Sequence, residues 1–214
     1  MQQETIVCGI LEEIKKVCPI YDCTETHAGI IKLWGTHLFA SQYRENPNMP
    51  VTMKDRSNIR YDKGLFITGK PGAGKTQIAT SIASWSAANF PKHQMRCISA
   101  IALVAKCKAA GNLSPLDSYR YGNVCLSDVG SEHQLTNIYG TIYNIIQEFI
   151  KVRIDAQATL LYKSLLYIES NITIAEFIER YEDDMGRIAS RFYALFNDVQ
   201  FEFKKDTKDY RRNA

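Results

Sequence analysis

Residues 69–76 constrain the fold more than any other part of this chain. They read Gly-Lys-Pro-Gly-Ala-Gly-Lys-Thr and match the pattern G-x-x-x-x-G-K-[ST] in full. A short apolar run at 65–68 precedes them, and a helical pattern at 76–89 follows them. This strand–loop–helix context is the one in which the pattern binds phosphate. The sequence therefore predicts a phosphate-binding loop that opens a helix of an α/β fold.

Each residue type in this loop has a chemical reason. Glycines let successive backbone N–H groups turn toward phosphate oxygens, and the start of the helix adds its positive dipole end. Lys75 places a charge on the β- and γ-phosphates, and the Thr76 hydroxyl is a ligand for Mg²⁺. The expected nucleotide-binding residues are Gly69, Pro71, Gly72, Ala73, Gly74, Lys75, Thr76 and Gln77.

Strands alternate with helices from Lys63 onward. The expected strands are residues 65–68, 95–98, 123–127, 165–168 and 199–203. The expected helices are residues 76–89, 100–110, 138–152 and 186–196, with a further helix that a Thr173–Glu176 capping box opens. This alternation predicts an α/β domain over residues 61–214, with a parallel sheet sandwiched by helices.

Residues 1–60 are predicted to be a helical appendage followed by a linker. Apolar residues recur with helical spacing at 3–17 and 28–39, and the polar stretch 41–62 contains Pro47 and Pro50. The apolar faces of the two helices have two possible uses, which are docking of a partner and packing against the core of the domain.

Two polar residues follow buried strands and are candidates for catalysis. Asp128 comes after the strand at 123–127, so its carboxylate points into the crevice where open α/β sheets bind ligands. It is the candidate acid for holding the metal or activating water. Asn171 follows the strand at 165–168 and is the candidate for orienting the attacking water.

Composition excludes several classes of protein. Hydrophobic residues make up 45% of the chain, which excludes whole-chain disorder. No apolar run is long enough to cross a membrane, and no signal peptide is recognisable, so we expect a cytoplasmic protein. The net charge of +3 is too mild to indicate nucleic-acid binding by itself. Lys106, Lys108 and the basic tail at 204–212 are candidate contacts or simply solvated charges.

The chain has 6 cysteines, and three of them precede a histidine near the N-terminus. The order Cys8, Cys18, Cys23, His27 is compatible with a zinc site. Cys8 also falls inside the helical pattern at 3–17, where a small thiol needs no metal to explain it.

From about residue 60 to 212 the sequence resembles AAA+ ATPases of the DnaC type, the helicase loaders of bacteria and phages. IstB, a transposition helper, is a relative of that group. The resemblance rests on residues 69–76, Asp128-Val129-Gly130-x-Glu132 and Ser170-Asn171, and most specifically on Glu179-Arg180-Tyr181, Gly186-Arg187-Ile188-Ala189-Ser190-Arg191 and Phe196-Asn197.

The resemblance implies an ATPase with ATP and Mg²⁺ as cofactors, which forms homo-oligomers on single-stranded DNA and loads a replicative DNA helicase. It implies that Asn171 is the sensor 1 residue, Arg191 an arginine finger acting on a neighbouring subunit, and Arg211 the sensor 2 arginine. The helices of residues 1–60 are then candidates for docking the helicase. A C-terminal helical lid is not expected, which agrees with the loader group.

One departure from the family pattern bears on turnover. The family places two adjacent acids before the x-Gly-x-Glu exit, and this chain has Ser127 in the first place and Asp128 in the second. Either Asp128 does the work of both acids poorly, or Ser127 is a weak metal-side ligand. Slow turnover would make nucleotide an assembly switch, and Ser127→Asp should then raise the rate. The alternative functions are an IstB-like helper on duplex DNA and a nucleotide-gated scaffold with little turnover.

Overall fold

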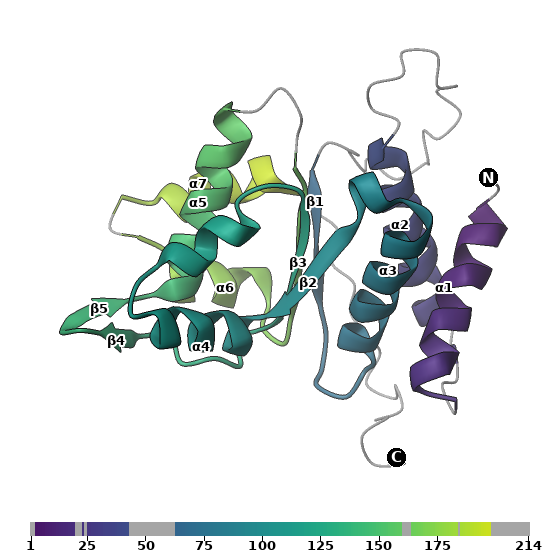
Figure 1. The fold of residues 1–214 in the computed structure, drawn as a ribbon, viewed down its shortest axis with the longest axis horizontal. Helices are drawn as coiled ribbons and strands as arrows, with labels where there is room; N and C mark the ends of the chain where they lie inside the picture. The colour runs from purple at the N-terminus through teal and green to yellow at the C-terminus, as the bar shows by residue number, and fades with distance from the viewer. Residues whose placement is uncertain are drawn as a thin grey trace.

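A parallel sheet forms the centre of the molecule, in the strand order β2-β3-β6-β1-β7 (Figure 1). The computed structural model describes residues 3–19, 23, 25–42, 63–159, 164–183 and 185–197. The strands are β1 (Gly64–Thr68), β2 (Met95–Ser99), β3 (Asn123–Val129), β6 (Leu166–Ser170) and β7 (Phe196–Asn197). All neighbouring pairs are parallel, so the carboxyl ends of the strands meet at one edge.

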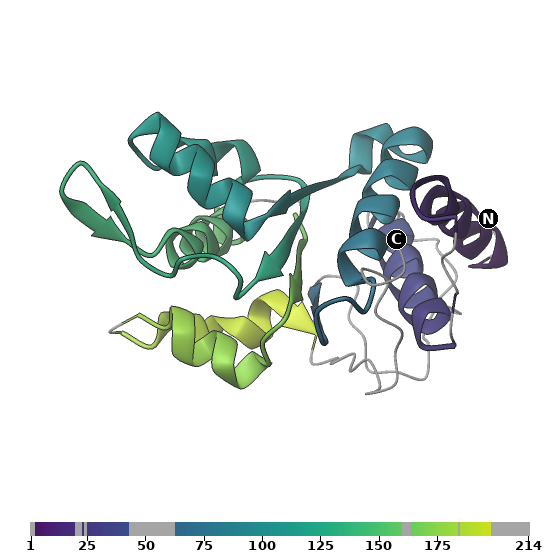
Figure 2. The same cartoon turned by 90° about the horizontal axis from the view of Figure 1, so that it is seen from below.

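Helices cover both faces of this sheet (Figures 1 and 2). One face carries α1 (Gln3–Val17), α2 (Glu25–Gln42) and α3 (Lys75–Asn89). The other carries α4 (Ala100–Ala110), α5 (Ile145–Thr159), α6 (Ile174–Tyr181) and α7 (Arg187–Leu195). Two short 3₁₀ turns, η2 (Pro91–His93) and η3 (Ser114–Tyr119), lead into β2 and β3. The α/β fold with a parallel sheet between helices is therefore confirmed.

Strands β1, β2, β3 and β6 each contribute to two separate hydrophobic clusters because successive side chains point to opposite faces of the sheet. On β1, Leu65 and Ile67 belong to the cluster under α1, α2 and α3, whereas Phe66 belongs to the cluster under α4 to α7. Cys125 of β3 and Tyr167 of β6 point toward α3 in the same way. This alternation explains why the strands are apolar on both faces.

The two N-terminal helices pack against the α3 side of the sheet. Trp34 of α2 stacks on Tyr167, with ring centroids 5.6 Å apart. The backbone of α1 approaches α3 so closely at Gly9 that a Cβ there would lie 2.5 Å from Nε1 of Trp85. Of the two uses predicted for these apolar faces, packing against the core is the one observed.

The helix predicted at 138–152 is wrong in its first part. Residues 136–143 form a hairpin of β4 (Thr136–Ile138) and β5 (Thr141–Tyr143), and α5 begins only at Ile145. Tyr139 and Gly140 have positive φ angles of 47° and 89°, as both central residues of a two-residue hairpin turn require. The Asn137 side chain accepts a hydrogen bond from the Gly140 N–H and closes the turn. Local turn chemistry thus overrides the helical spacing of the isoleucines.

Helix α7 ends one residue earlier than predicted, and a short strand follows it directly. The helix ends at Leu195, and Phe196–Asn197 pair with β1 as strand β7. The strand expected at 199–203, the linker at 43–62 and the basic tail at 204–212 lie outside the described residues. Within the described residues, no helix has the length and apolarity needed to cross a membrane.

Candidate nucleotide-binding site

The loop between β1 and α3 has the backbone of a phosphate cradle. Gly72 and Gly74 adopt left-handed φ angles of 82° and 85°, which only glycine adopts without strain. No side chain caps α3 at Gly74, and the first N–H groups of a helix have no partner within it. The loop therefore presents backbone N–H groups and a helix dipole to an anion, so its residues fit the phosphates of a nucleotide.

Lys75 is buried beneath this loop, with its ammonium held by three oxygens. Nζ donates to the carbonyl oxygens of Gly69 at 2.7 Å and Lys70 at 2.9 Å, and to Oδ1 of Asn171 at 3.0 Å. These contacts fix the charge where the loop meets the end of β6. Thr76 and Gln77 follow in the first turn of α3, and Pro71 and Ala73 lie in the loop itself.

Glu169, near the end of β6, connects the other elements of the site. Its side chain is 1% exposed. Oε2 accepts hydrogen bonds from the Thr76 hydroxyl at 3.1 Å and from the Asp128 backbone N–H at 3.0 Å. Oε1 lies 3.5 Å from Nζ of Lys75. Burial raises the pKa of Glu169, and the nearby Lys75 ammonium opposes that shift.

Sequence reasoning did not select Glu169. The available signal was its position, since it is an acidic residue in an otherwise apolar strand and stands two residues before Asn171. An acid in such a strand is costly to bury, and this cost indicates a specific partner or ligand.

Asp128 lies at the end of β3, beside Glu169. Its φ of 54° is left-handed, and the hydrogen bond from its N–H to Glu169 holds the backbone in that conformation. The residue is half-buried, so its carboxylate is reachable from solvent. Ser127, immediately before it, is 3% exposed.

Asn171 bridges the ends of β3 and β6 as well as contacting Lys75. Its backbone N–H donates to the Val129 carbonyl oxygen at 3.3 Å, and Nδ2 donates to Oγ of Ser131 at 3.0 Å. The structure therefore brings Lys75, Thr76, Asp128 and Asn171 together, with Glu169 between them.

Arg191, the predicted arginine finger, is not part of this cluster. Arg191 is exposed on α7, and within the described residues no hydrogen bond or ion pair involves its side chain. Arg187 of the same helix is paired with Asp183 instead. Arg211 lies outside the described residues.

The motif residues that carry the family resemblance contact one another. Glu132 accepts from the Gly130 N–H through Oε2 at 2.9 Å, and through Oε1 from the Tyr181 hydroxyl. Nη2 of Arg180 donates to the Glu132 carbonyl oxygen at 2.7 Å. Burial raises the pKa of Tyr181, and its bond to the Glu132 carboxylate raises it further. This clasp joins the exit of β3 to the end of α6.

The alternative zinc site finds no support among the described residues. No group of three or more His, Cys, Asp or Glu side chains there is arranged to hold a metal ion by itself. Cys8 is exposed, whereas His27 is buried, with Nε2 2.9 Å from the Ala73 carbonyl oxygen of the phosphate loop. The histidine therefore braces the loop from α2.

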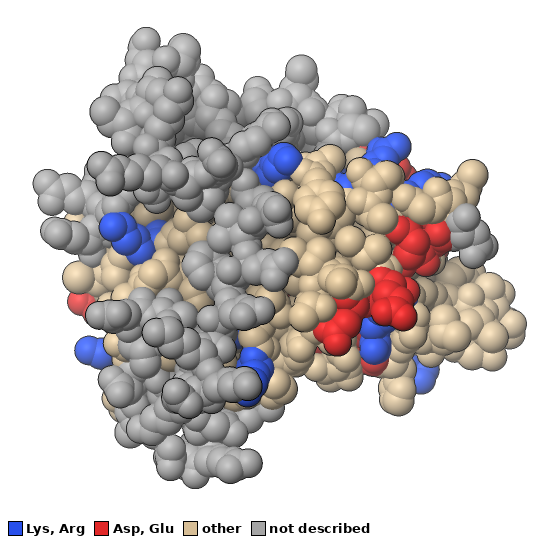
Figure 3. All heavy atoms as spheres, turned by 180° about the vertical axis from the view of Figure 1, so that it is seen from behind, with Lys and Arg blue, Asp and Glu red and all other residues tan. Residues whose placement is uncertain are grey.

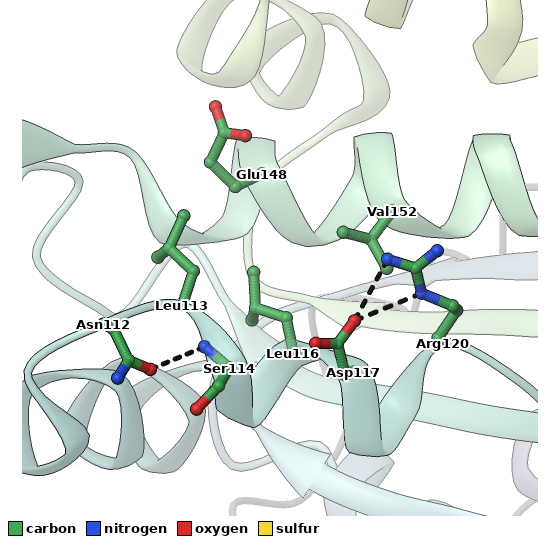
Figure 4. A pocket seen from close by; sticks show the side chains of 8 residues that line it. All are labelled: Asn112, Leu113, Ser114, Leu116, Asp117, Arg120, Glu148 and Val152. Atoms are coloured by element: carbon green, nitrogen blue, oxygen red, sulfur yellow. Dashed lines mark hydrogen bonds and ion pairs between the residues drawn. The ribbon is translucent and has the colours of Figure 1, made fainter.

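Two surface features lie apart from the loop. On the face in Figure 3, the described Lys and Arg side chains do not gather in one basic patch. Lys106 is held by the Tyr119 hydroxyl at 2.9 Å, and Lys108 is exposed. A hollow of about 420 Å³ lies between η3 and α5, and Figure 4 shows Asp117 and Arg120 paired at its edge. Its lining contains none of the predicted site residues.

Comparison with known proteins identifies the fold. No family model and no curated protein matches the chain. A crystal structure of the DnaC helicase loader aligns with 88% of this chain and 96% of that chain, with a TM-score of 0.55 and 14% identity. The chain shares its α/β fold with that helicase loader. The expected fold resemblance is thus confirmed.

Two further structures align less well. Domain III of the Thermotoga maritima replication initiation protein DnaA has a TM-score of 0.49 at 16% identity, over 86% of this chain and 66% of that chain. C. elegans PCH-2 has a TM-score of 0.45 at 15% identity, over 88% of this chain and 51% of that chain.

Proposed function

We propose that this protein is an AAA+ ATPase that assembles on single-stranded DNA in its ATP-bound state and loads a replicative helicase. The observation that carries the proposal is the convergence of Lys75, Thr76, Asp128 and Asn171 at the carboxyl ends of three neighbouring strands. The overall likeness to the DnaC helicase loader supports the choice of function.

The residues divide the chemistry of ATP hydrolysis between them. The loop N–H groups and Lys75 bind the phosphates, and Thr76 contributes a ligand to Mg²⁺, which neutralises developing charge when it is bound. The carboxylate of Asp128 takes a proton from the attacking water, and the Asn171 amide orients that water. Both side chains lie at the open edge of the sheet, where water has access.

Arg191 completes the site of a neighbouring subunit. It is exposed and, within the described part of the chain, its guanidinium forms no hydrogen bond or ion pair, so it is available to a second copy. An arginine supplied in trans stabilises transition-state charge only after assembly. Turnover should therefore depend on protein concentration.

The test is ATP turnover measured over a range of protein concentrations, with single-stranded DNA, with duplex DNA and without DNA. Lys75→Ala is the blank. A rate that rises steeply with concentration and with single-stranded DNA supports the proposal. Stimulation by duplex DNA alone would favour the IstB-like alternative. Tight ATP binding without turnover would favour the nucleotide-gated scaffold. This alternative arises because Ser127 stands where the family has an acid.

Mixing two inactive variants tests the trans arrangement directly. Lys75→Ala removes phosphate binding but leaves Arg191, whereas Arg191→Ala leaves the phosphate loop intact. A mixture should recover part of the activity, because Lys75→Ala subunits supply their arginine to Arg191→Ala neighbours. Arg187→Ala is the matched control on the same helix and should stay active, since Arg187 is paired with Asp183. If Arg187→Ala were inactive and Arg191→Ala active, Arg187 and not Arg191 would be the arginine finger.

A further inference from the structure

The position that the family fills with a metal-side acid is a serine in this chain. Ser127 has no carboxylate to offer a divalent cation, yet the Thr76 hydroxyl still donates to a carboxylate at 3.1 Å. That carboxylate belongs to Glu169, on the neighbouring strand. In P-loop proteins the Ser or Thr of the loop and a carboxylate on an adjacent strand together hold Mg²⁺.

The sheet places the two positions on one face. Cys125 of β3 and Tyr167 of β6 are register partners, and both point toward α3. Two residues further along each strand stand Ser127 and Glu169, so the pleat directs both toward the start of α3. β6 also lies between β3 and β1, the strand that leads into the loop. A carboxylate on β6 therefore starts closer to the loop than one on β3.

The bonding of Glu169 is incomplete without a ligand. Oε2 has two donors, but Oε1 has no hydrogen-bond partner within the described residues and has only the Lys75 ammonium at 3.5 Å. Buried carboxylate oxygens normally have hydrogen-bond partners. Mg²⁺ in nucleotide sites is typically bound by one or two carboxylates together with the phosphates. Glu169 provides such a carboxylate next to Thr76 of the phosphate loop.

We propose that Glu169 is the metal-side acid of this site, relocated from β3 to β6, and that Asp128 is left free to act on water alone. The inference rests on the proposed binding of ATP with Mg²⁺. It differs from both alternatives that the serine suggested, since neither Asp128 nor Ser127 has to hold the metal.

The test measures equilibrium binding of a fluorescent ATP analogue in Mg²⁺ and again in EDTA. The dissociation constant in EDTA divided by that in Mg²⁺ gives a ratio that isolates the contribution of the metal to binding. Glu169→Gln keeps the size of the side chain but removes its charge, and it should reduce this ratio about 10- to 100-fold, as loss of groups that support a bound metal does. Binding in EDTA should stay the same or tighten. Ser127→Ala is the matched control and should leave the ratio unchanged.

A double variant tests whether a carboxylate on β3 can replace the one on β6. Ser127→Asp combined with Glu169→Gln returns a carboxylate to β3 and should restore part of the ratio. A ratio unchanged in Glu169→Gln would overturn the inference while leaving ATP binding intact. If circular dichroism shows that Glu169→Gln does not fold, the Ser127→Ala variant decides. A reduced binding ratio in Ser127→Ala overturns the inference, and an unchanged ratio supports it. Absence of analogue binding by the wild-type chain would overturn the proposed function itself.

Discussion

Removing Lys75 should destabilise the nucleotide-free protein and not only abolish phosphate binding. Lys75 and Glu169 are 3% and 1% exposed, and Nζ and Oε1 are 3.5 Å apart. If Lys75 is truncated to alanine, Glu169 retains two donors but loses the cation beside it. Breaking a buried ion pair by removing one partner costs about 3–5 kcal/mol. In a chain of this length this corresponds to a fall in Tm of about 6–20 °C.

Lys75→Ala and Glu169→Gln should not lower the free energy of unfolding by the same amount. Glu169→Gln leaves the Lys75 ammonium with three oxygen acceptors, so its effect on stability should be smaller than that of Lys75→Ala. The double variant removes both charges together and should be more stable than the sum of the single effects predicts, by about 2 kcal/mol, within the range for contacting residues.

Urea unfolding followed by circular dichroism, without nucleotide or divalent metal, measures all three free energies of unfolding. Additivity of the single effects within about 0.5 kcal/mol would refute the reasoning, because residues that do not interact behave in that way. The result also bears on the turnover assay, in which the Lys75→Ala blank must be shown to be folded.

Other predictions concern stability and use the same unfolding assay. Gly9→Ala should cost about 1–2 kcal/mol because the new methyl group would overlap Trp85. Gly29→Ala should stabilise by about 0.5–1 kcal/mol, since no atom of the described residues lies within 4 Å of the new methyl group. Equal effects would mean that α1 does not pack as described. Arg153→Met should cost about 3 kcal/mol, because its buried guanidinium donates to three carbonyl oxygens. Tyr181→Phe should cost about 2 kcal/mol because the buried Glu132 carboxylate loses a hydrogen-bond donor. An unchanged free energy of unfolding would show that this clasp does not contribute to stability.

The phosphate loop and its sheet could be predicted because local patterns determine them. The glycine spacing at 69–76 and the apolar runs on either side are short-range signals, and they led to β1 and α3 within one residue at each end. The same is true of α6, whose Thr173–Glu176 capping box is present in full.

The remaining features depend on contacts between distant segments. Glu169 owes its position to Thr76 and Asp128, and the spacing within β6 alone gives no sign of either contact. The use of the N-terminal apolar faces likewise depends on α3, which starts more than 30 residues after α2 ends. The hairpin at 136–143 depends on local turn chemistry. Tyr139 and Gly140 adopt the positive φ angles of a two-residue turn, and this overrides the helical spacing of the isoleucines.

Sedimentation velocity tests the central claim most directly. The account predicts that a non-hydrolysable ATP analogue with Mg²⁺ and a single-stranded oligonucleotide shifts the protein from small species to a homo-oligomer. ADP should not produce the shift, and Lys75→Ala should not show it. Arg191→Ala should assemble more weakly, because Arg191 is proposed to contact the γ-phosphate bound by its neighbour. A sedimentation coefficient that does not change with nucleotide or DNA would contradict the account.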